Sequence, residues 1–242
     1  MSDRKTPATT PKGDVAEPRS ASADVQAFIA RAQAPSSTAT GSGRLVLALD
    51  ATMSRQPTWD LACKMQAEMF DAAGKAGALK VQLVYFRGFG ECRASRFVAD
   101  TAALKDLMVR IDCRAGHTQI GKVLAHALKE TAREKVNALV YIGDAMEEDI
   151  DALAEKAGRL GLQGVPVFVF QEGRDAGAEQ AFREIARLSK GAWFRFDQGS
   201  AAMLAKLLSA VAVYATGGFK ALEARGRPED RLMIENMRGK AG

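Results

Sequence analysis

The chain has 242 residues, of which 47% are hydrophobic and 26% charged, and its formal net charge is +5 at pH 7. This length allows one sizeable core with extensions, and the composition is ordinary for a globular protein. The basic residues form no stripe with interleaved aromatic residues, so we expect no nucleic-acid partner. We also expect no membrane span, because no apolar run approaches the length that one requires.

Two further features of the sequence indicate a cellular location. The first residues are polar and lack the apolar stretch of a secretory signal. The three cysteines, Cys63, Cys92 and Cys113, are odd in number and widely spaced, which suits reduced thiols. We therefore expect a cytoplasmic protein, and a bacterial one.

The first 43 residues are predicted to be a disordered extension and linker, because residues 1–21 contain few aromatic or β-branched side chains. A short helix is possible after Ser22, with Val25, Phe28 and Ile29 on one face. The Ser/Thr/Gly-rich segment 35–43 is typical of a linker.

The main domain opens with an unbroken apolar run at residues 45–49 that leads directly into Asp50. Such a run is typical of a strand that is buried on both faces of a parallel sheet. In open α/β sheets, ligands bind just beyond the carboxyl ends of such strands. The sequence therefore predicts a polar site that begins at Asp50 and continues with Thr52 and Ser54.

Alternating patterns continue along the chain and predict an α/β fold. The expected strands are 44–49, 79–86, 92–98, 139–142, 165–170 and 192–196. The expected helices are 57–76, 100–111, one from 119, one from 150, one around 182–185, and 203–214. The short turn 88–90 permits only antiparallel neighbours, so we predict an edge hairpin in a mostly parallel sheet with helices on both faces. Residues 219–242 are predicted to be a polar basic tail.

Three separate segments offer side-chain oxygens at loops beside predicted strands or helices. These oxygens belong to Asp50, Thr52, Ser54, Thr118 and Asp144. Two carboxylates and three hydroxyls form a hard-oxygen set, which suits Mg²⁺ or Mn²⁺. Hydroxyls are neutral ligands, so a bound ion would keep a strong attraction for an added carboxylate.

These segments resemble the metal-ion-dependent adhesion site of the von Willebrand factor type A (VWA) domain. The resemblance rests on Asp50-Ala51-Thr52-Met53-Ser54, on Thr118 before a helix, and on Gly143-Asp144, within about residues 44–218. It implies a Rossmann-like, doubly wound, six-stranded sheet with one antiparallel edge strand. It also implies that Thr52, Ser54 and Thr118 touch the metal directly, while Asp50 and Asp144 act through water. A protein partner would then complete the site with an acidic residue.

Each oxygen-bearing residue also has an ordinary structural interpretation. Asp50, Thr118 and Asp144 could each cap the helix that follows. In addition, Thr52 stands where the family usually has a serine. The acidic run from Asp144 to Asp151 is best explained by first-turn acids at a helix N-terminus, although one of them could mask the metal's open position. His117 and His126 are expected to be a loop residue and a structural or exposed residue.

Two other functions use the same residues. Asp50 and Gly143-Asp144 also resemble the haloacid-dehalogenase phosphatases, with Asp50 as the nucleophile and with Asp144 and Glu148 or Asp149 holding Mg²⁺. Against this, Thr52 stands where most of those phosphatases carry an acidic residue. The remaining alternative is a scaffold that binds its partner without metal. We expect a non-enzymatic module that binds a protein partner through a Mg²⁺-type site.

Overall fold

A computed structural model describes residues 43–55, 79–99, 110–197 and 201–239, together with the helical positions Ala103, Asp106 and Met108. The predicted short helix within residues 1–43 and the predicted helix 57–76 lie outside the described residues. Most of the predicted helix 100–111 also lies outside them.

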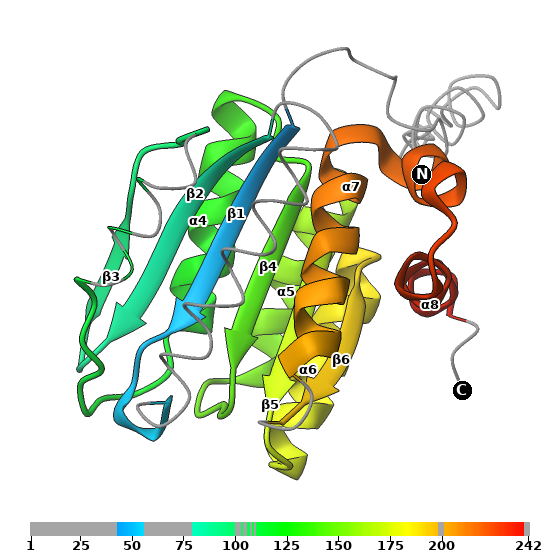
Figure 1. The fold of residues 1–242 in the computed structure, drawn as a ribbon. Coiled ribbons are helices and arrows are strands. Elements are labelled where there is room, and N and C mark those ends of the chain that lie inside the picture. The colour runs from blue at the N-terminus through cyan, green and yellow to red at the C-terminus, as the bar shows by residue number, and fades with distance from the viewer. Residues whose placement is uncertain are drawn as a thin grey trace, which may run out of the picture. The chain divides into compact units, whose positions relative to one another are not determined.

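Six strands form one mixed sheet in the order β3-β2-β1-β4-β5-β6 (Figure 1). The strands are β1 (Gly43–Asp50), β2 (Leu79–Arg87), β3 (Glu91–Ala94), β4 (Ala138–Gly143), β5 (Val167–Glu172) and β6 (Ala192–Phe196). All neighbours pair in parallel except β2 and β3, which form an antiparallel hairpin at one edge. The prediction of a mostly parallel six-stranded sheet with one antiparallel edge strand is confirmed. Strand β3 is shorter than predicted; beyond Ala94, the N–H of Ser95 donates to Leu83 O, and Val98 forms an isolated bridge to Val81.

Helices cover both faces of this sheet, as predicted. They are α4 (Ile120–Arg133), α5 (Ile150–Leu162), α6 (Ala176–Ser189), α7 (Ala201–Arg225) and α8 (Pro228–Met237), with a short 3-10 turn η1 at Met53–Arg55. Helices α4, α5 and α6 lie on one face, and α7 lies on the other (Figure 1).

Strand β1 is buried along its whole length because it lies between β2 and β4 under both helical layers. Leu45, Leu47 and Leu49 pack in the core on the α7 side. Val46 and Ala48 pack in the core on the α4 side. The continuous apolar run is explained by this two-sided burial, since successive side chains of a strand point to opposite faces.

The direction of winding reverses between β1 and β4. From β1 the chain proceeds to β2 and β3 on one side, while β4, β5 and β6 follow on the other. The connections that leave two such strands diverge, and ligand sites of open α/β sheets occupy the resulting crevice beyond the carboxyl ends. Asp50 ends β1, and Asp144 directly follows β4.

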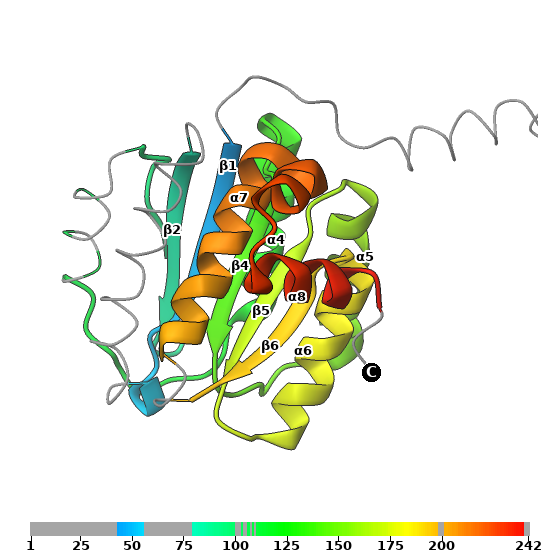
Figure 2. The same ribbon diagram turned by 45° about the vertical axis from the view of Figure 1, so that its right-hand side comes forward.

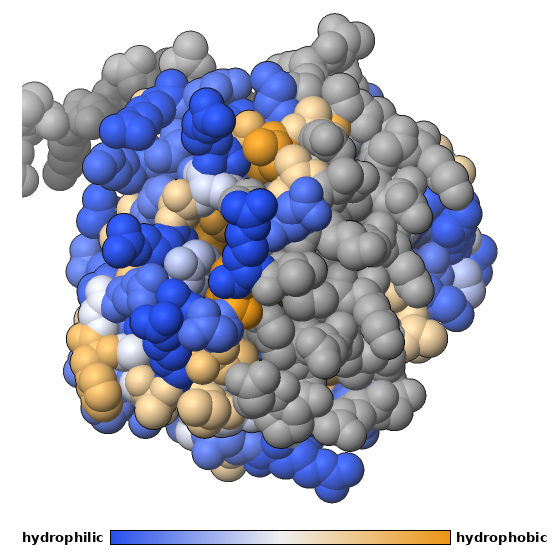
Figure 3. All heavy atoms as spheres, turned by 60° about the vertical axis from the view of Figure 1, so that its left-hand side comes forward, coloured by the Kyte–Doolittle hydropathy of each residue, from blue (hydrophilic) through white to orange (hydrophobic). Residues whose placement is uncertain are grey.

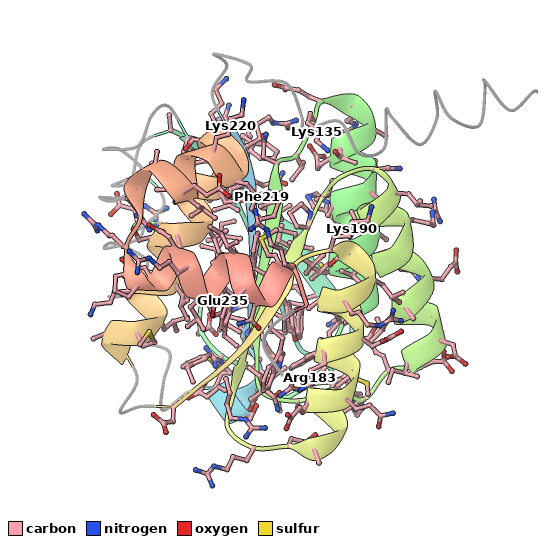
Figure 4. All side chains as sticks on the ribbon, turned by 90° about the vertical axis from the view of Figure 1, so that its right-hand side faces the viewer. Lys135, Arg183, Lys190, Phe219, Lys220 and Glu235 are labelled. Atoms are coloured by element: carbon pink, nitrogen blue, oxygen red, sulfur yellow. The ribbon has the colours of Figure 1, made fainter. Side chains whose placement is uncertain are left out.

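The prediction of a polar tail from residue 219 is wrong for residues 219–237. Helix α7 continues through a kink at Gly218, whose φ of 63° is accessible to glycine, and α8 follows (Figure 2). Leu222 and Met233 have no exposed surface and belong to the core on the α7 side. Figure 4 shows α8 crossing in front of the sheet beside α7, with Phe219 just past the kink. The basic surface residues of this segment made the spacing of its apolar residues hard to recognise in the sequence.

Helix α7 is the one described helix that is long and apolar enough, by length and composition, to cross a membrane. Its apolar residues pack on the sheet, including Leu204, Leu208 and Val211. A buried core helix of a globular domain has the same composition, so this helix is weak evidence for a membrane span.

Candidate metal-binding site at the carboxyl edge of the sheet

The segment after β1 turns tightly and gathers its oxygens. The backbone N–H of Thr52 donates to Asp50 Oδ1 over 2.8 Å, and the hydroxyls of Thr52 and Ser54 lie 3.1 Å apart. Ala51 fixes the turn on both sides, because its N–H donates to Phe86 O and its carbonyl accepts from Arg114 N. Three of the five predicted site residues therefore share one short, well-anchored segment.

The carboxyl group of Asp50 is buried and only partly hydrogen-bonded. It has no exposed surface, and its Oδ2 has no hydrogen-bond partner among the described residues. The pKa of Asp50 is raised to about 6, chiefly by burial and to a smaller extent by the negative charge of Asp144, while the Thr52 hydrogen bonds and Arg55 act in the opposite direction. A buried carboxylate with an unused oxygen costs free energy unless a donor or a cation meets it.

Thr118 comes from a different segment and is held by the loop that follows β4. Its hydroxyl accepts a hydrogen bond from Glu147 N at 3.0 Å, and its own N–H donates to Glu147 Oε2 at 3.1 Å. This reciprocal pair links the loop before α4 to the loop before α5. Thr118 is buried, and Gln119, rather than Thr118, occupies the N-cap position of α4.

Asp144 and Tyr141 bring two further buried oxygens to the same region. Neither Asp144 Oδ1 nor the Tyr141 hydroxyl has a hydrogen-bond partner among the described residues. Burial raises the pKa of Tyr141 well above its usual value, and the charges of Asp50, Asp144 and Glu148 add to the effect. Tyr141 pairs with Ala48, and Ile142 with Leu49, in the neighbouring strands β4 and β1, so Tyr141, Asp144 and Asp50 come from the same end of this strand pair.

The acidic run beyond Asp144 lies at helix N-termini, as predicted, although the cap of α5 is not the suggested Asp144. Asp149, and not Asp144, caps α5, because its Oδ1 accepts from Ala152 N at 2.7 Å. Glu148 reaches across to α4, where its carboxylate accepts from the N–H groups of Ile120 and Gly121. The run therefore stabilises the N-termini of α4 and α5, and the acidic side chain at the N-terminus of α4 comes from a loop that is distant in the sequence.

The donor set fits a hard divalent cation. The described residues contain no group of three or more His, Cys, Asp or Glu side chains arranged to hold a metal. Only two carboxylates, Asp50 and Asp144, belong to this site, and hydroxyls supply the remaining oxygens. The two aspartates each keep a buried oxygen that no described donor satisfies. A cation between them would neutralise their repulsion, and oxygens are the ligands that Mg²⁺ and Mn²⁺ prefer.

Sequence reasoning missed Tyr141 and Phe89 at this edge. Tyr141 lies in the predicted buried strand 139–142, although a phenol next to a strand's carboxyl end is a detectable signal. Phe89 lies in the predicted turn 88–90, yet it is 80% exposed, and its ring meets the His117 ring edge-on at 5.3 Å.

No protein-family profile and no curated protein sequence matches this chain. Solved structures resemble its fold. A von Willebrand factor type A structure from Catenulispora acidiphila superposes with a TM-score of 0.59 at 19% identity, covering 73% of this chain and 43% of the other. The VWA domain of SpRpn10 gives 0.56 at 12% identity, covering 69% and 95%. An aerotolerance-related membrane protein from Bacteroides fragilis gives 0.53 at 17% identity, covering 82% and 100%.

The chain thus has a VWA fold, with its mostly parallel Rossmann-like sheet and single antiparallel edge strand. This chain spans less than half the length of the Catenulispora chain. At these identities the likeness extends to the fold, while the chemistry of the site rests on the side chains described above.

Proposed function

We propose that this chain is a protein-interaction module that holds Mg²⁺ or Mn²⁺ with Asp50, Thr52, Ser54, Thr118 and Asp144. The observation that carries the proposal is a pair of buried carboxylate oxygens, Asp50 Oδ2 and Asp144 Oδ1, that have no hydrogen-bond partner among the described residues. They come from the carboxyl ends of the two strands between which the winding of the sheet reverses; Thr52 and Ser54 follow Asp50, and Thr118 is hydrogen-bonded to Glu147 in the loop after Asp144. When bound, the ion would supply an electrophilic centre for an acidic side chain of a partner protein.

The chain's own residues prepare the site for this role. The Thr52–Ser54 contact and the Thr118–Glu147 pair fix the hydroxyl groups before any ligand arrives. Preorganised ligands lose little conformational freedom on binding, which favours affinity. We place this interaction in the cytoplasm, a proposal that the widely spaced cysteines of the sequence support.

The phosphatase alternative needs Glu148 or Asp149 as a metal ligand. Glu148 instead accepts hydrogen bonds from the first amides of α4, and Asp149 caps α5. Both carboxylates are thus committed to helix ends, which disfavours that alternative. Turnover of p-nitrophenyl phosphate in the presence of Mg²⁺ would revive it.

Titration calorimetry of the full chain with MgCl₂ and MnCl₂ tests the proposal, beside Asp50→Ala and the control Asp151→Ala. Asp151 is exposed in the first turn of α5, so its loss leaves the cluster intact. We expect saturable binding that Asp151→Ala retains and Asp50→Ala weakens at least about tenfold, or about 1.4 kcal/mol. Added acetate should strengthen binding by completing the shell. Absence of binding even with acetate would overturn the proposal in favour of a metal-independent scaffold.

A further inference from the structure

An exposed aromatic side chain stands at the hairpin turn beside the candidate metal site. Phe89, between β2 and β3, is 80% exposed, while most large apolar side chains of the described chain are buried. Figure 3 shows the side of the molecule nearer β3, where the coloured surface is largely hydrophilic and apolar residues occupy only small separate areas. A single exposed apolar residue is ordinary in itself. Phe89 differs from an ordinary exposed apolar residue in the contacts that its turn and its ring make.

The turn that carries Phe89 is fastened to the start of α4. Gln119 Nε2 donates to the carbonyls of Arg87 and Gly88, each at 3.3 Å, and Lys122 Nζ donates to Gly90 O at 3.0 Å. Gly116 packs so closely on Gly88 that a Cβ there would overlap the Gly88 backbone. A fixed backbone of this kind presents an aromatic ring at a small entropic cost to binding.

The same contacts connect Phe89 to the oxygen cluster. The Phe89 ring lies edge-on to the ring of His117, the residue before Thr118. His117 Nδ1 lies 3.0 Å from Glu147 Oε2, the oxygen that also accepts from Thr118 N. The exposed aromatic pair is therefore connected to Thr118 of the candidate metal site through the Glu147 carboxylate.

Charged side chains of both signs surround this turn. The cations are Arg87, Arg93, Arg114 and Lys122, and the neighbouring carboxylates are Glu91, Asp112 and Glu147. Arg93 and Arg114 are 71% and 56% exposed at their side chains. The excess of cations favours an acidic binding partner over a basic one.

We propose that Phe89, backed by His117, is an anchor for the partner protein. The occupant is an acidic segment whose carboxylate reaches the metal site and whose neighbouring large apolar side chain packs on the Phe89 ring. In an extended segment the two side chains would lie on the same face, at one fixed even spacing and at roughly 3.3 Å per residue. This inference rests on the proposed metal-dependent function and specifies the chemistry of its partner.

A displayed library of random twelve-residue peptides, selected on the immobilised full chain in Mg²⁺, tests this directly. Selections on Phe89→Ala and Asp50→Ala run in parallel. Leu162→Ala is the matched control, because Leu162 at the end of α5 is 82% exposed and lies outside this surface. Synthetic versions of the enriched peptides, with a Gln version of each acid, then give affinities by fluorescence anisotropy.

We expect the unmodified chain and Leu162→Ala to enrich Asp or Glu together with a large apolar residue at that spacing. Phe89→Ala should keep the acidic preference, lose the apolar one, and bind the enriched peptides about tenfold more weakly. Acidic enrichment without an apolar preference, or an apolar preference that survives Phe89→Ala, overturns the inference and leaves the metal-dependent function standing. Failure to enrich acids at all, or equal enrichment on Asp50→Ala, overturns both.

Discussion

Two buried aspartates in this protein, Asp230 and Asp50, differ in how far hydrogen bonds and an opposite charge satisfy their carboxylates. Asp230, in the first turn of α8, has no exposed surface and receives the Nε and Nη2 groups of Arg225 together with the N–H of Arg227. The Nη1 group of Arg225 also donates a hydrogen bond to Ser209 Oγ at 2.7 Å. Asp50 is equally buried, but one of its oxygens has no partner among the described residues.

This difference distinguishes a structural carboxylate, Asp230, from the carboxylate that we propose as a metal ligand, Asp50. Burying a charge is tolerated when hydrogen bonds and a counter-charge satisfy it, as at Asp230, where the pair fastens α8 to α7. A charge that is left incompletely satisfied destabilises the fold and is best explained by a ligand that the site awaits. The contrast predicts opposite effects on stability when each carboxylate is neutralised.

The largest expected effect is a loss of stability in Asp230→Asn. The substitution keeps the shape of the side chain but leaves the Arg225 guanidinium in a poorly solvated position without its counter-charge. Breaking one partner of a buried ion pair typically costs about 3–5 kcal/mol. Urea denaturation followed by circular dichroism measures the change in the free energy of unfolding.

The control for this experiment replaces both members with apolar residues, as Arg225→Leu with Asp230→Leu. Replacing both charges is often close to neutral, so the double variant should be markedly more stable than Asp230→Asn. A loss below about 1 kcal/mol in Asp230→Asn would mean that the pair does not secure α8, and the comparison with Asp50 would then fail.

The next effect has the opposite sign: Asp50→Asn should stabilise the metal-free protein near pH 7.5. The folded-state pKa of Asp50 is about 6, raised mainly by burial, against an ordinary value of 3.8. A difference of about two pKa units corresponds to at most about 3 kcal/mol of destabilisation by the ionised form. Unfolding in chelator measures the gain, which saturating Mg²⁺ should offset by stabilising the unmodified chain alone.

The pH dependence of this gain follows from the direction of the pKa shift. Between about pH 6 and pH 4 the folded state binds more protons than the unfolded state, so the unmodified chain gains stability from this group as the pH falls. The advantage of Asp50→Asn should therefore shrink across that window. A variant that is less stable than the unmodified chain at pH 7.5 in chelator would indicate that the Asp50 carboxylate is structural, like that of Asp230.

Sequence patterns predicted most of the fold because burial leaves a periodic trace. The two-sided burial of β1 required an unbroken apolar run, and the tight turn at Gly88-Phe89-Gly90 required antiparallel neighbours. The end of the domain escaped prediction. Leu222 follows Ala221, and Met233 stands between Leu232 and Ile234, but charged residues flank both short apolar groups, so no long apolar stretch beyond Gly218 indicated α8.

The sequence indicates the candidate residues of this site one by one, but it does not indicate the hydrogen bonds that hold them. Strand ends indicated Asp50 and Asp144, because parallel strands bring their carboxyl ends to one edge. The partners of the acidic run depend on tertiary contacts between loops about thirty residues apart, such as Glu147 with Thr118. No local pattern encodes which helix N-terminus a distant glutamate will cap.

The smallest expected effect concerns Glu148, an acid near the site whose carboxylate is fully engaged. Its two oxygens accept from the N–H groups of Ile120 and Gly121, so Glu148→Gln loses the charge that stabilises the N-terminus of α4. We expect a loss of about 1 kcal/mol in urea denaturation, with Mg²⁺ binding by calorimetry unchanged. Asp149→Ala, which removes the cap of α5, is the matched control and should cost about as much with the same indifference to metal. Abolished Mg²⁺ binding in Glu148→Gln alone would instead assign this carboxylate to the metal, as the phosphatase alternative requires. The presence or absence of hydrogen-bond partners would then no longer distinguish a structural carboxylate from one that binds metal.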